Sequence, residues 1–86
     1  MNYQDQVVVL TGASGGIGSA MAKKFTDLGA KVALLDITVD RVQALADKLG
    51  LGSDRAFCAA VDVSNEESVK ATVDAIVKHF GRIDVL

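Results

Sequence analysis

The sequence of 86 residues contains no proline, no tryptophan and a single cysteine. One cysteine cannot form an internal disulfide, and the Cys and His spacings of zinc sites are absent, so we expect neither a disulfide framework nor a metal site. No apolar run approaches the ~20 residues that a membrane span needs, and no basic region precedes an apolar stretch as in a signal peptide. We therefore expect a cytoplasmic protein that does not contact a membrane.

The sequence also lacks an excess of basic residues. Nine Lys and Arg residues against eleven Asp and Glu residues give a formal net charge of −2. A protein that holds a nucleic-acid backbone needs clustered positive charge to neutralise phosphates. This composition argues against a nucleic-acid partner, and the hydrophobic fraction of 50% is typical of a globular protein.

The chain is short for the amount of apolar surface that it carries. A length of 86 residues allows at most one domain. The mean hydropathy is +0.32, although a chain of this size buries only about 60% of its extended surface. We expect residues 1–86 to be the N-terminal portion of a single longer domain, truncated within its fourth strand.

Apolar runs alternate with segments of helical periodicity along the chain. Runs without polar alternation are typical of strands that are covered on both faces, as in parallel sheets. Such runs occupy residues 6–11, 31–36 and 55–63, and a fourth begins at 83–86. The helical segments between them each end at a glycine, namely Gly29, Gly50 and Gly81. The order βαβαβαβ, with right-handed crossovers, predicts an α/β fold with a parallel sheet and helices packed outside it.

Apolar periodicity also predicts which helix faces are buried. The third helix should be capped by Ser64 and Glu67, which have the S-x-x-E spacing of a capping box. Cys58 and His79 are expected to be structural residues of a strand and of a helix end. The expected buried positions are Ile17, Ala20, Met21, Phe25 and Leu28 in the first helix, Val42, Leu45, Ala46 and Leu49 in the second, and Val69, Val73, Ile76, Val77 and Phe80 in the third.

A glycine-rich loop joins the first strand to the first helix. Four of the eight residues from Thr11 to Gly18 are glycines. Glycine permits a tight turn with positive φ, a close approach of the backbone to a pyrophosphate, and close packing of the helix on the strand. The N-terminus of the following helix offers free N–H groups and a favourable dipole to a phosphate. A P-loop is excluded because Ser19, not lysine, follows Gly18, and the G-x-G-x-x-G spacing fails because Met21 takes the place of its third glycine.

The spacing that is present, T-G-x-x-x-G-x-G over residues 11–18 with Ile17 inside it, resembles the cofactor fingerprint of the short-chain dehydrogenase/reductase family. The resemblance continues at Asp36, at the Asp62–Val63 pair and at the G-R-I-D-V-L run of residues 81–86. It implies a Rossmann-type doubly wound parallel sheet. Residues 1–86 would then be the N-terminal portion of a single NAD(P)-binding domain.

The residue at the end of the second strand bears on the choice of cofactor. Asp36 lies 18 residues beyond Gly18, close to the ~20 expected for an acid that binds the adenosine ribose. A carboxylate there favours free hydroxyls and repels a 2′-phosphate. Gly15 stands where many NADP-using members of the family carry arginine, and Ile37 adds no charge. We therefore predict NAD, with NADP as the alternative, which Arg41 would favour if its side chain reached a phosphate.

The resemblance also implies roles for individual residues. Asp62 would accept a hydrogen bond from the adenine amino group, and the Val63 N–H would donate to a ring nitrogen. Ser14 and the Ile17 backbone would contact the ribose and pyrophosphate. The complete predicted cofactor site is Gly12, Ser14, Gly15, Gly16, Ile17, Gly18, Asp36, Ile37, Asp62 and Val63.

Enzymes of this family interconvert an alcohol and a carbonyl by hydride transfer, using a tyrosine four residues before a lysine together with a serine and an asparagine. No Y-x-x-x-K occurs here, because Val7 follows the only tyrosine, Tyr3, at that spacing. We therefore predict no catalytic residue in this chain, which would supply the adenosine and pyrophosphate half of the site in an enzyme acting on a small alcohol or carbonyl. The family commonly forms tetramers, which implies a homo-oligomer. The alternatives are a nucleotide-binding module or remnant without turnover and, disfavoured by the glycine spacing, an S-adenosylmethionine methyltransferase.

Overall fold

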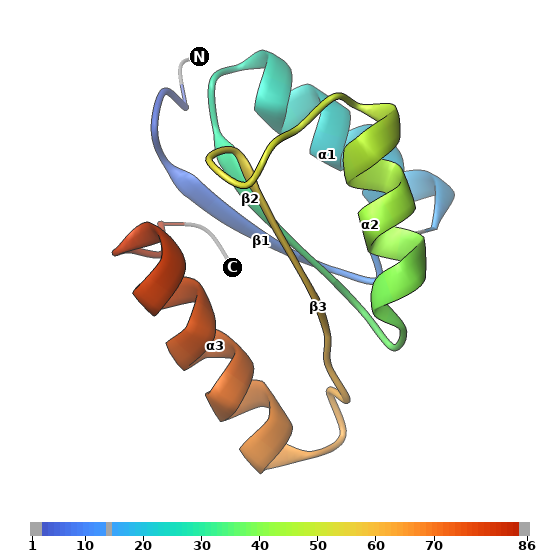
Figure 1. The fold of residues 1–86 in the computed structure, drawn as a ribbon, viewed down its shortest axis with the longest axis vertical. Coiled ribbons are helices and arrows are strands. Elements are labelled where there is room, and N and C mark those ends of the chain that lie inside the picture. Colours follow the sequence, from blue (N-terminus) through green and yellow to red (C-terminus); the bar gives the residue numbers. More distant parts are fainter. Residues whose placement is uncertain (1–2, 14, 85–86) are drawn as a thin grey trace.

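The chain folds into alternating strands and helices, as the sequence predicts (Figure 1). The structure is a computed structural model that describes residues 3–13 and 15–84. The third strand ends at Ala60 and is shorter than expected, although the Val61 N–H still donates to the Asp36 carbonyl over 2.8 Å. The elements are β1 (Val7–Thr11), α1 (Gly16–Asp27), β2 (Lys31–Asp36), α2 (Val39–Lys48), β3 (Ala56–Ala60) and α3 (Glu66–Phe80).

The three strands form a parallel sheet in the order β1-β2-β3. The register places Val9 opposite Ala33, and Ala33 opposite Phe57. The predicted fourth strand falls partly on residues 85–86, which lie outside the described residues, and Ile83 and Asp84 are not in a strand. Nevertheless the Asp84 N–H donates to the Val7 carbonyl over 3.0 Å. The chain therefore returns to the edge of β1 that faces away from β2.

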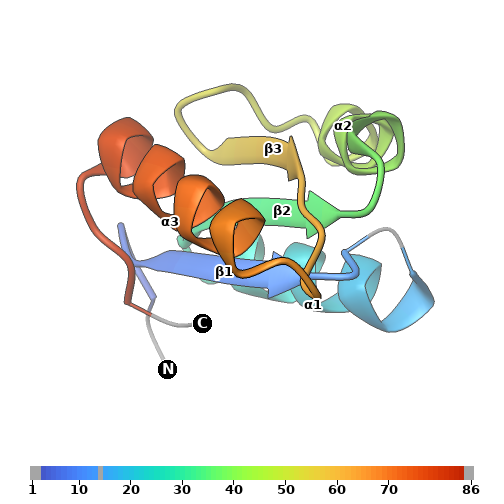
Figure 2. The same cartoon turned by 90° about the horizontal axis from the view of Figure 1, so that it is seen from below.

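The helices cover both faces of the sheet, with α1 and α2 on one face and α3 on the other (Figure 2). Successive side chains of a strand point to opposite faces. In β1, Val8 and Leu10 accordingly pack in the hydrophobic cluster beneath α1 and α2, while Val7 and Val9 pack in the cluster beneath α3. Both faces of β1 and β2 are buried, which explains why their sequences show no polar alternation.

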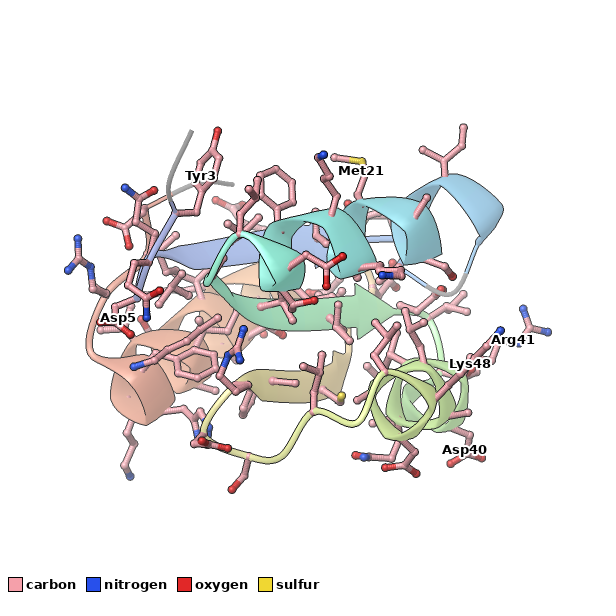
Figure 3. The ribbon with its side chains drawn as sticks, turned by 90° about the horizontal axis from the view of Figure 1, so that it is seen from above. Tyr3, Asp5, Met21, Asp40, Arg41 and Lys48 are labelled. Atoms are coloured by element: carbon pink, nitrogen blue, oxygen red, sulfur yellow. The ribbon has the colours of Figure 1, made fainter. Side chains whose placement is uncertain are left out.

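The first helix is rotated relative to the apolar stripe that the sequence indicates, so that prediction is wrong in part. Ile17 is 81% exposed and Met21 is 42% exposed, and Met21 points away from the sheet (Figure 3). Ala20 is exposed as well, Phe25 and Leu28 are half-buried, and the residue of α1 that is fully buried is Ala22. Ala22 and the half-buried Phe25 are the residues of α1 that pack with the cluster beneath this helix.

The second helix buries the predicted positions Val42, Leu45 and Ala46. In α3 the prediction needs two corrections. Val77 is 43% exposed, although it was expected to be buried. Thr72 is buried beside the expected Ile76, and its hydroxyl donates to the Ser68 carbonyl over 2.8 Å. The capping residue is not Ser64.

The N-cap of α3 is Asn65, one residue later than the sequence predicts. Its side-chain oxygen accepts a hydrogen bond from the Ser68 N–H over 3.0 Å. The Ser64 hydroxyl donates instead to the Asp62 carboxylate over 2.6 Å. Asparagine, serine and aspartate cap helices about equally well, so the contact between Ser64 and Asp62 decides which residue takes the cap.

Candidate functional site

A pocket of about 280 Å³ lies at the edge of the sheet where the parallel strands end. The carboxyl ends of parallel strands meet at one edge, where ligands bind in folds of this type. Five of the ten predicted site residues line this pocket, although they come from three separate segments of the chain. Its lining residues are Thr11, Gly12, Asp36, Ile37, Val61, Asp62 and Val63.

Two glycines of the loop are required by the fold itself. Gly12 has a φ of +64°, a conformation that other residues rarely adopt. A Cβ on Gly18 would lie 2.7 Å from both the Ala13 Cα and the Gly12 carbonyl oxygen. Gly12 thus supplies the predicted tight turn, whereas Gly18 lets the helix lie close to the loop residues Gly12 and Ala13 and not directly against the strand.

The other two glycines border open space. A Cβ on Gly16 would meet nothing within 4 Å, and one on Gly15 would make only an ordinary contact with the Gly12 carbonyl oxygen, at 3.5 Å. The chain therefore does not itself require glycine at either position. Both positions leave open space beside the loop.

The N-terminus of α1 adjoins this open space. Its N-cap, Gly15, makes no side-chain capping bond, and the first turn contains no acidic residue. The Ser19 N–H donates to the Gly15 carbonyl over 2.8 Å and begins the helical ladder. The N–H groups of Gly16, Ile17 and Gly18 precede that bond, at the positions where a helix has no acceptors of its own. Ser14, also predicted for this site, lies outside the described residues.

Asp36, at the end of β2, is half-buried in the pocket wall. Its Oδ1 accepts a hydrogen bond from the Ile37 N–H over 2.7 Å. Ile37 and Val63 also line the pocket, and their side chains are 73% and 70% exposed. Apolar side chains this exposed are suited to contact a flat, apolar group of a ligand.

Asp62 is held by its neighbour Ser64. The Asp62 Oδ1 accepts from the Ser64 N–H over 3.0 Å and from the Ser64 hydroxyl over 2.6 Å. These two hydrogen bonds lower the pKa of the Asp62 carboxyl below its ordinary value. The side chain is therefore an anionic hydrogen-bond acceptor at neutral pH.

The sequence does not predict this arrangement, because the capping-box pattern assigns Ser64 to the helix. The available signal is the short spacing of Asp62 and Ser64, since an aspartate side chain commonly accepts a bond from the backbone two residues later. The Val63 N–H, between these residues, has no hydrogen-bond partner among the described residues. The pocket therefore presents a donor and an acceptor on adjacent residues.

Arg41 lies in a different part of the surface. It lines a larger hollow of about 420 Å³ between α1 and α2, together with Lys23 and Lys48. Figure 3 shows Arg41 extending outward from α2. Asp36 does not line this hollow, and the larger hollow contains none of the ten predicted site residues. The smaller pocket is the better candidate, because chemically suited groups converge there.

The remaining polar candidates have structural surroundings. The His79 Nε2 lies 2.6 Å from the Ser53 carbonyl oxygen, and its ring packs against Phe57 and Phe80. Burial raises the pKa of the Cys58 thiol, which makes it less reactive. Over residues 3–13 and 15–84, no group of three His, Cys, Asp or Glu side chains could hold a metal ion. No helix in these same ranges is long and apolar enough to span a membrane.

The family model of the short chain dehydrogenases matches residues 6–86, which is nearly the whole chain. The chain therefore belongs to this family, and the predicted resemblance is confirmed. It is 42% identical over 83 residues to a D-threitol dehydrogenase of Mycolicibacterium smegmatis, covering 94% of this chain and 31% of that protein. The chain thus spans about a third of the length of the relatives that it matches.

Solved structures give the same fold. A 3-ketoacyl-(acyl-carrier-protein) reductase of Brucella melitensis in complex with NADH superposes with a TM-score of 0.87 at 36% identity, over 96% of this chain and 33% of that one. A metagenomic short-chain oxidoreductase in complex with NADP has the same TM-score and identity, over 96% of this chain and 38% of that one. The Rossmann-type fold is confirmed, while overall similarity does not distinguish between the two cofactors.

Proposed function

We propose that residues 1–86 bind the adenosine and pyrophosphate half of NAD in an oxidoreductase that interconverts an alcohol and a carbonyl. The observation that carries this proposal is the 280 Å³ pocket at the strand ends. It joins a glycine loop, a carboxylate at the end of β2 and a donor–acceptor pair after β3. The chain is then the N-terminal portion of a single NAD-binding domain.

The pyrophosphate would lie at the N-terminus of α1. An uncapped helix start without acidic residues attracts a dianion through its N–H groups and its dipole. The open space at Gly15 and Gly16 lets the phosphate oxygens approach the backbone. The predicted contacts of Ser14 and Ile17 belong to this part of the site.

The ribose hydroxyls would donate to Asp36. A carboxylate at this position accepts hydrogen bonds from a 2′-hydroxyl and repels a 2′-phosphate. Arg41, which the sequence offers as a partner for such a phosphate, lines the other hollow. Charge and position together support NAD over NADP.

The adenine would lie against Ile37 and Val63. Adenine offers an amino donor at C6 and an acceptor at N1, and these match the Asp62 carboxylate and the Val63 N–H respectively. Guanine and hypoxanthine present the opposite pattern, an oxygen at C6 and a donor at N1. The pocket is therefore complementary to adenine and not to those bases.

The nicotinamide, when bound, supplies the hydride chemistry, while the protein supplies binding and orientation. The residues described here fix the cofactor by its adenosine end. The groups that move the substrate proton belong elsewhere in the protein, since this sequence has no Y-x-x-x-K. The substrate is a small alcohol or carbonyl compound.

Isothermal titration of the intact protein with NAD, NADP and nicotinamide hypoxanthine dinucleotide tests this proposal. We expect NAD to bind tightest, NADP to be disfavoured by the Asp36 charge, and the hypoxanthine analogue to be disfavoured by Asp62. A spectrophotometric assay with NAD and a panel of alcohols then tests for turnover. Absence of binding to all three nucleotides would contradict the proposal, and binding without turnover would favour a nucleotide-binding module.

A further inference from the structure

The carboxylate of Asp62 is oriented by a serine that has no assigned role. Both hydrogen bonds from Ser64, from its N–H at 3.0 Å and its hydroxyl at 2.6 Å, end on the same oxygen, Oδ1. Among the described residues, Oδ2 has no hydrogen-bond partner. Ser64 therefore fixes the rotation of the carboxylate and leaves one oxygen for a ligand.

The backbone of the same turn is anchored to α3 by a second serine. The Asp62 N–H donates to the Ser68 hydroxyl oxygen over 3.1 Å. Ser68 is itself fixed, because its N–H donates to the Asn65 cap over 3.0 Å. The Asn65 N–H donates to the Asp62 carbonyl over 3.0 Å. The turn that carries the Val63 N–H is thus bonded to the first turn of a helix.

This network matters because Asp62 is exposed. An exposed carboxylate without such bonds samples several rotamers in water and loses that freedom when it binds a ligand. Ser64 also cannot serve α3 as its cap, since Asn65 occupies that position. The Ser64 N–H and hydroxyl both donate to Asp62 instead.

We propose that Ser64 and Ser68 are positioning residues, which hold the Asp62 Oδ2 and the Val63 N–H at the spacing of the adenine amino group and ring nitrogen. The inference rests on the proposed function, because it assigns the pair to adenine. It extends that function to residues that do not themselves touch the base. Because the turn is already ordered before the ligand binds, less conformational entropy is lost on binding, and affinity for adenine in particular is raised.

The test uses the intact protein and the affinity ratio between NAD and nicotinamide hypoxanthine dinucleotide, measured by isothermal titration. In Ser64→Ala we expect the ratio to fall by about three- to tenfold, with the hypoxanthine analogue bound as in the wild type. Ser64→Thr keeps the hydroxyl and should restore the ratio. In turnover, KM for NAD should rise while kcat stays unchanged, as for an interaction that is equal in the ground and transition states.

Ser68→Ala provides a second variant that acts from the side of α3, and it should also lower the ratio. Ser53→Ala is the matched control, because Ser53 is exposed in a turn away from the pocket. Circular dichroism and melting temperature check that each variant is folded.

Three outcomes are informative. An unchanged ratio in folded Ser64→Ala and Ser68→Ala would overturn the positioning role while leaving the proposed function intact. An equal loss of affinity for both dinucleotides would also overturn it, because that result indicates a general disturbance of the pocket. Wild-type protein that binds both dinucleotides equally would instead contradict the assignment of Asp62 to adenine, and the inference with it.

Discussion

Asp84 binds Val7 through both its backbone and its side chain. The Asp84 N–H donates to the Val7 carbonyl over 3.0 Å, and the Asp84 Oδ2 accepts from the Val7 N–H over 2.8 Å. Arg82 donates to the other carboxylate oxygen over 2.6 Å. These bonds join the two ends of the described chain. They pair the N–H and the carbonyl of Val7 on the edge of β1 that faces away from β2.

The hydrogen bonds of the Asp84 carboxylate with Val7 and Arg82 should make the stability of the fold depend on pH in the acidic range. The bonds from Arg82 and from the Val7 N–H lower the pKa of the Asp84 carboxyl below its ordinary value. A depressed folded-state pKa stabilises the fold above the unfolded-state value, about 3.9, and this contribution is lost as pH falls through the folded-state pKa. We expect the melting temperature of the intact protein to decrease when the pH is lowered beneath about 4. In Asp84→Asn, which keeps an acceptor but not the charge, that acid-dependent loss should be smaller, and an identical pH profile would contradict the assignment.

The two kinds of glycine in the loop should respond differently to alanine. In Gly18→Ala the new methyl group collides with Ala13 and Gly12, so the free energy of unfolding should fall by about 1–3 kcal/mol. In Gly16→Ala the methyl group meets no protein atom, and stability should be unchanged or raised by up to ~1 kcal/mol. Urea denaturation measures both values.

Cofactor titration of the same glycine variants completes this comparison. If Gly16 leaves room for a pyrophosphate, Gly16→Ala should weaken NAD binding without loss of stability. Unchanged NAD affinity in Gly16→Ala would place the phosphate elsewhere. Equal stability losses in the two variants would contradict the geometry of the loop.

Substitution of Asp36 should change cofactor preference. Removing the carboxylate in Asp36→Ala removes the repulsion of a 2′-phosphate and an acceptor for the 2′-hydroxyl. We expect the ratio of kcat/KM for NAD to that for NADP to fall by about tenfold or more, equivalent to ~1.4 kcal/mol. Arg41→Ala serves as the control and should leave the ratio unchanged. A cofactor ratio that is insensitive to Asp36 would remove this residue from the ribose site.

The cap of α3 can be checked by replacing two neighbouring residues by alanine in turn. Asn65→Ala removes the bond to the Ser68 N–H and should lower the free energy of unfolding by about 0.5–2 kcal/mol. Ser64→Ala should cost less stability, because its hydroxyl serves Asp62 and not the helix. Chemical denaturation of both variants decides the matter, and a larger loss in Ser64→Ala would restore the capping box that the sequence predicts.

Much of this architecture could be predicted from local patterns. Buried runs identified β1 and β2, helical periodicity identified the inner face of α2, and the glycine spacing located the loop. The sequence predicts Asp36 at the end of β2, as observed, whereas Asp62 lies two residues after the end of β3 and not within that strand. These features depend on neighbouring residues, whose sterics and polarity are fixed by the chain itself.

Features that depend on distant segments could not be predicted in this way. The rotation of α1, which exposes Ile17 and Met21, follows from how closely Gly18 lets the helix approach Ala13. The rotation of the Asp62 carboxylate follows from a contact with Ser64 that competes with helix capping. In each case two local arrangements have similar energies, and a contact made only in the folded chain selects one.

The sequence by itself determined the order of elements, the parallel sheet and the residues placed at its carboxyl edge, because periodicity and glycine spacing are local properties. Only the tertiary structure shows that Arg41 lines a hollow apart from the pocket that Asp36 shares with the Asp62–Val63 pair, and that Asp84 binds Val7. The physical reason is that these relationships depend on how the segments pack against one another in space. Packing selects among arrangements that the local sequence leaves nearly equal in energy.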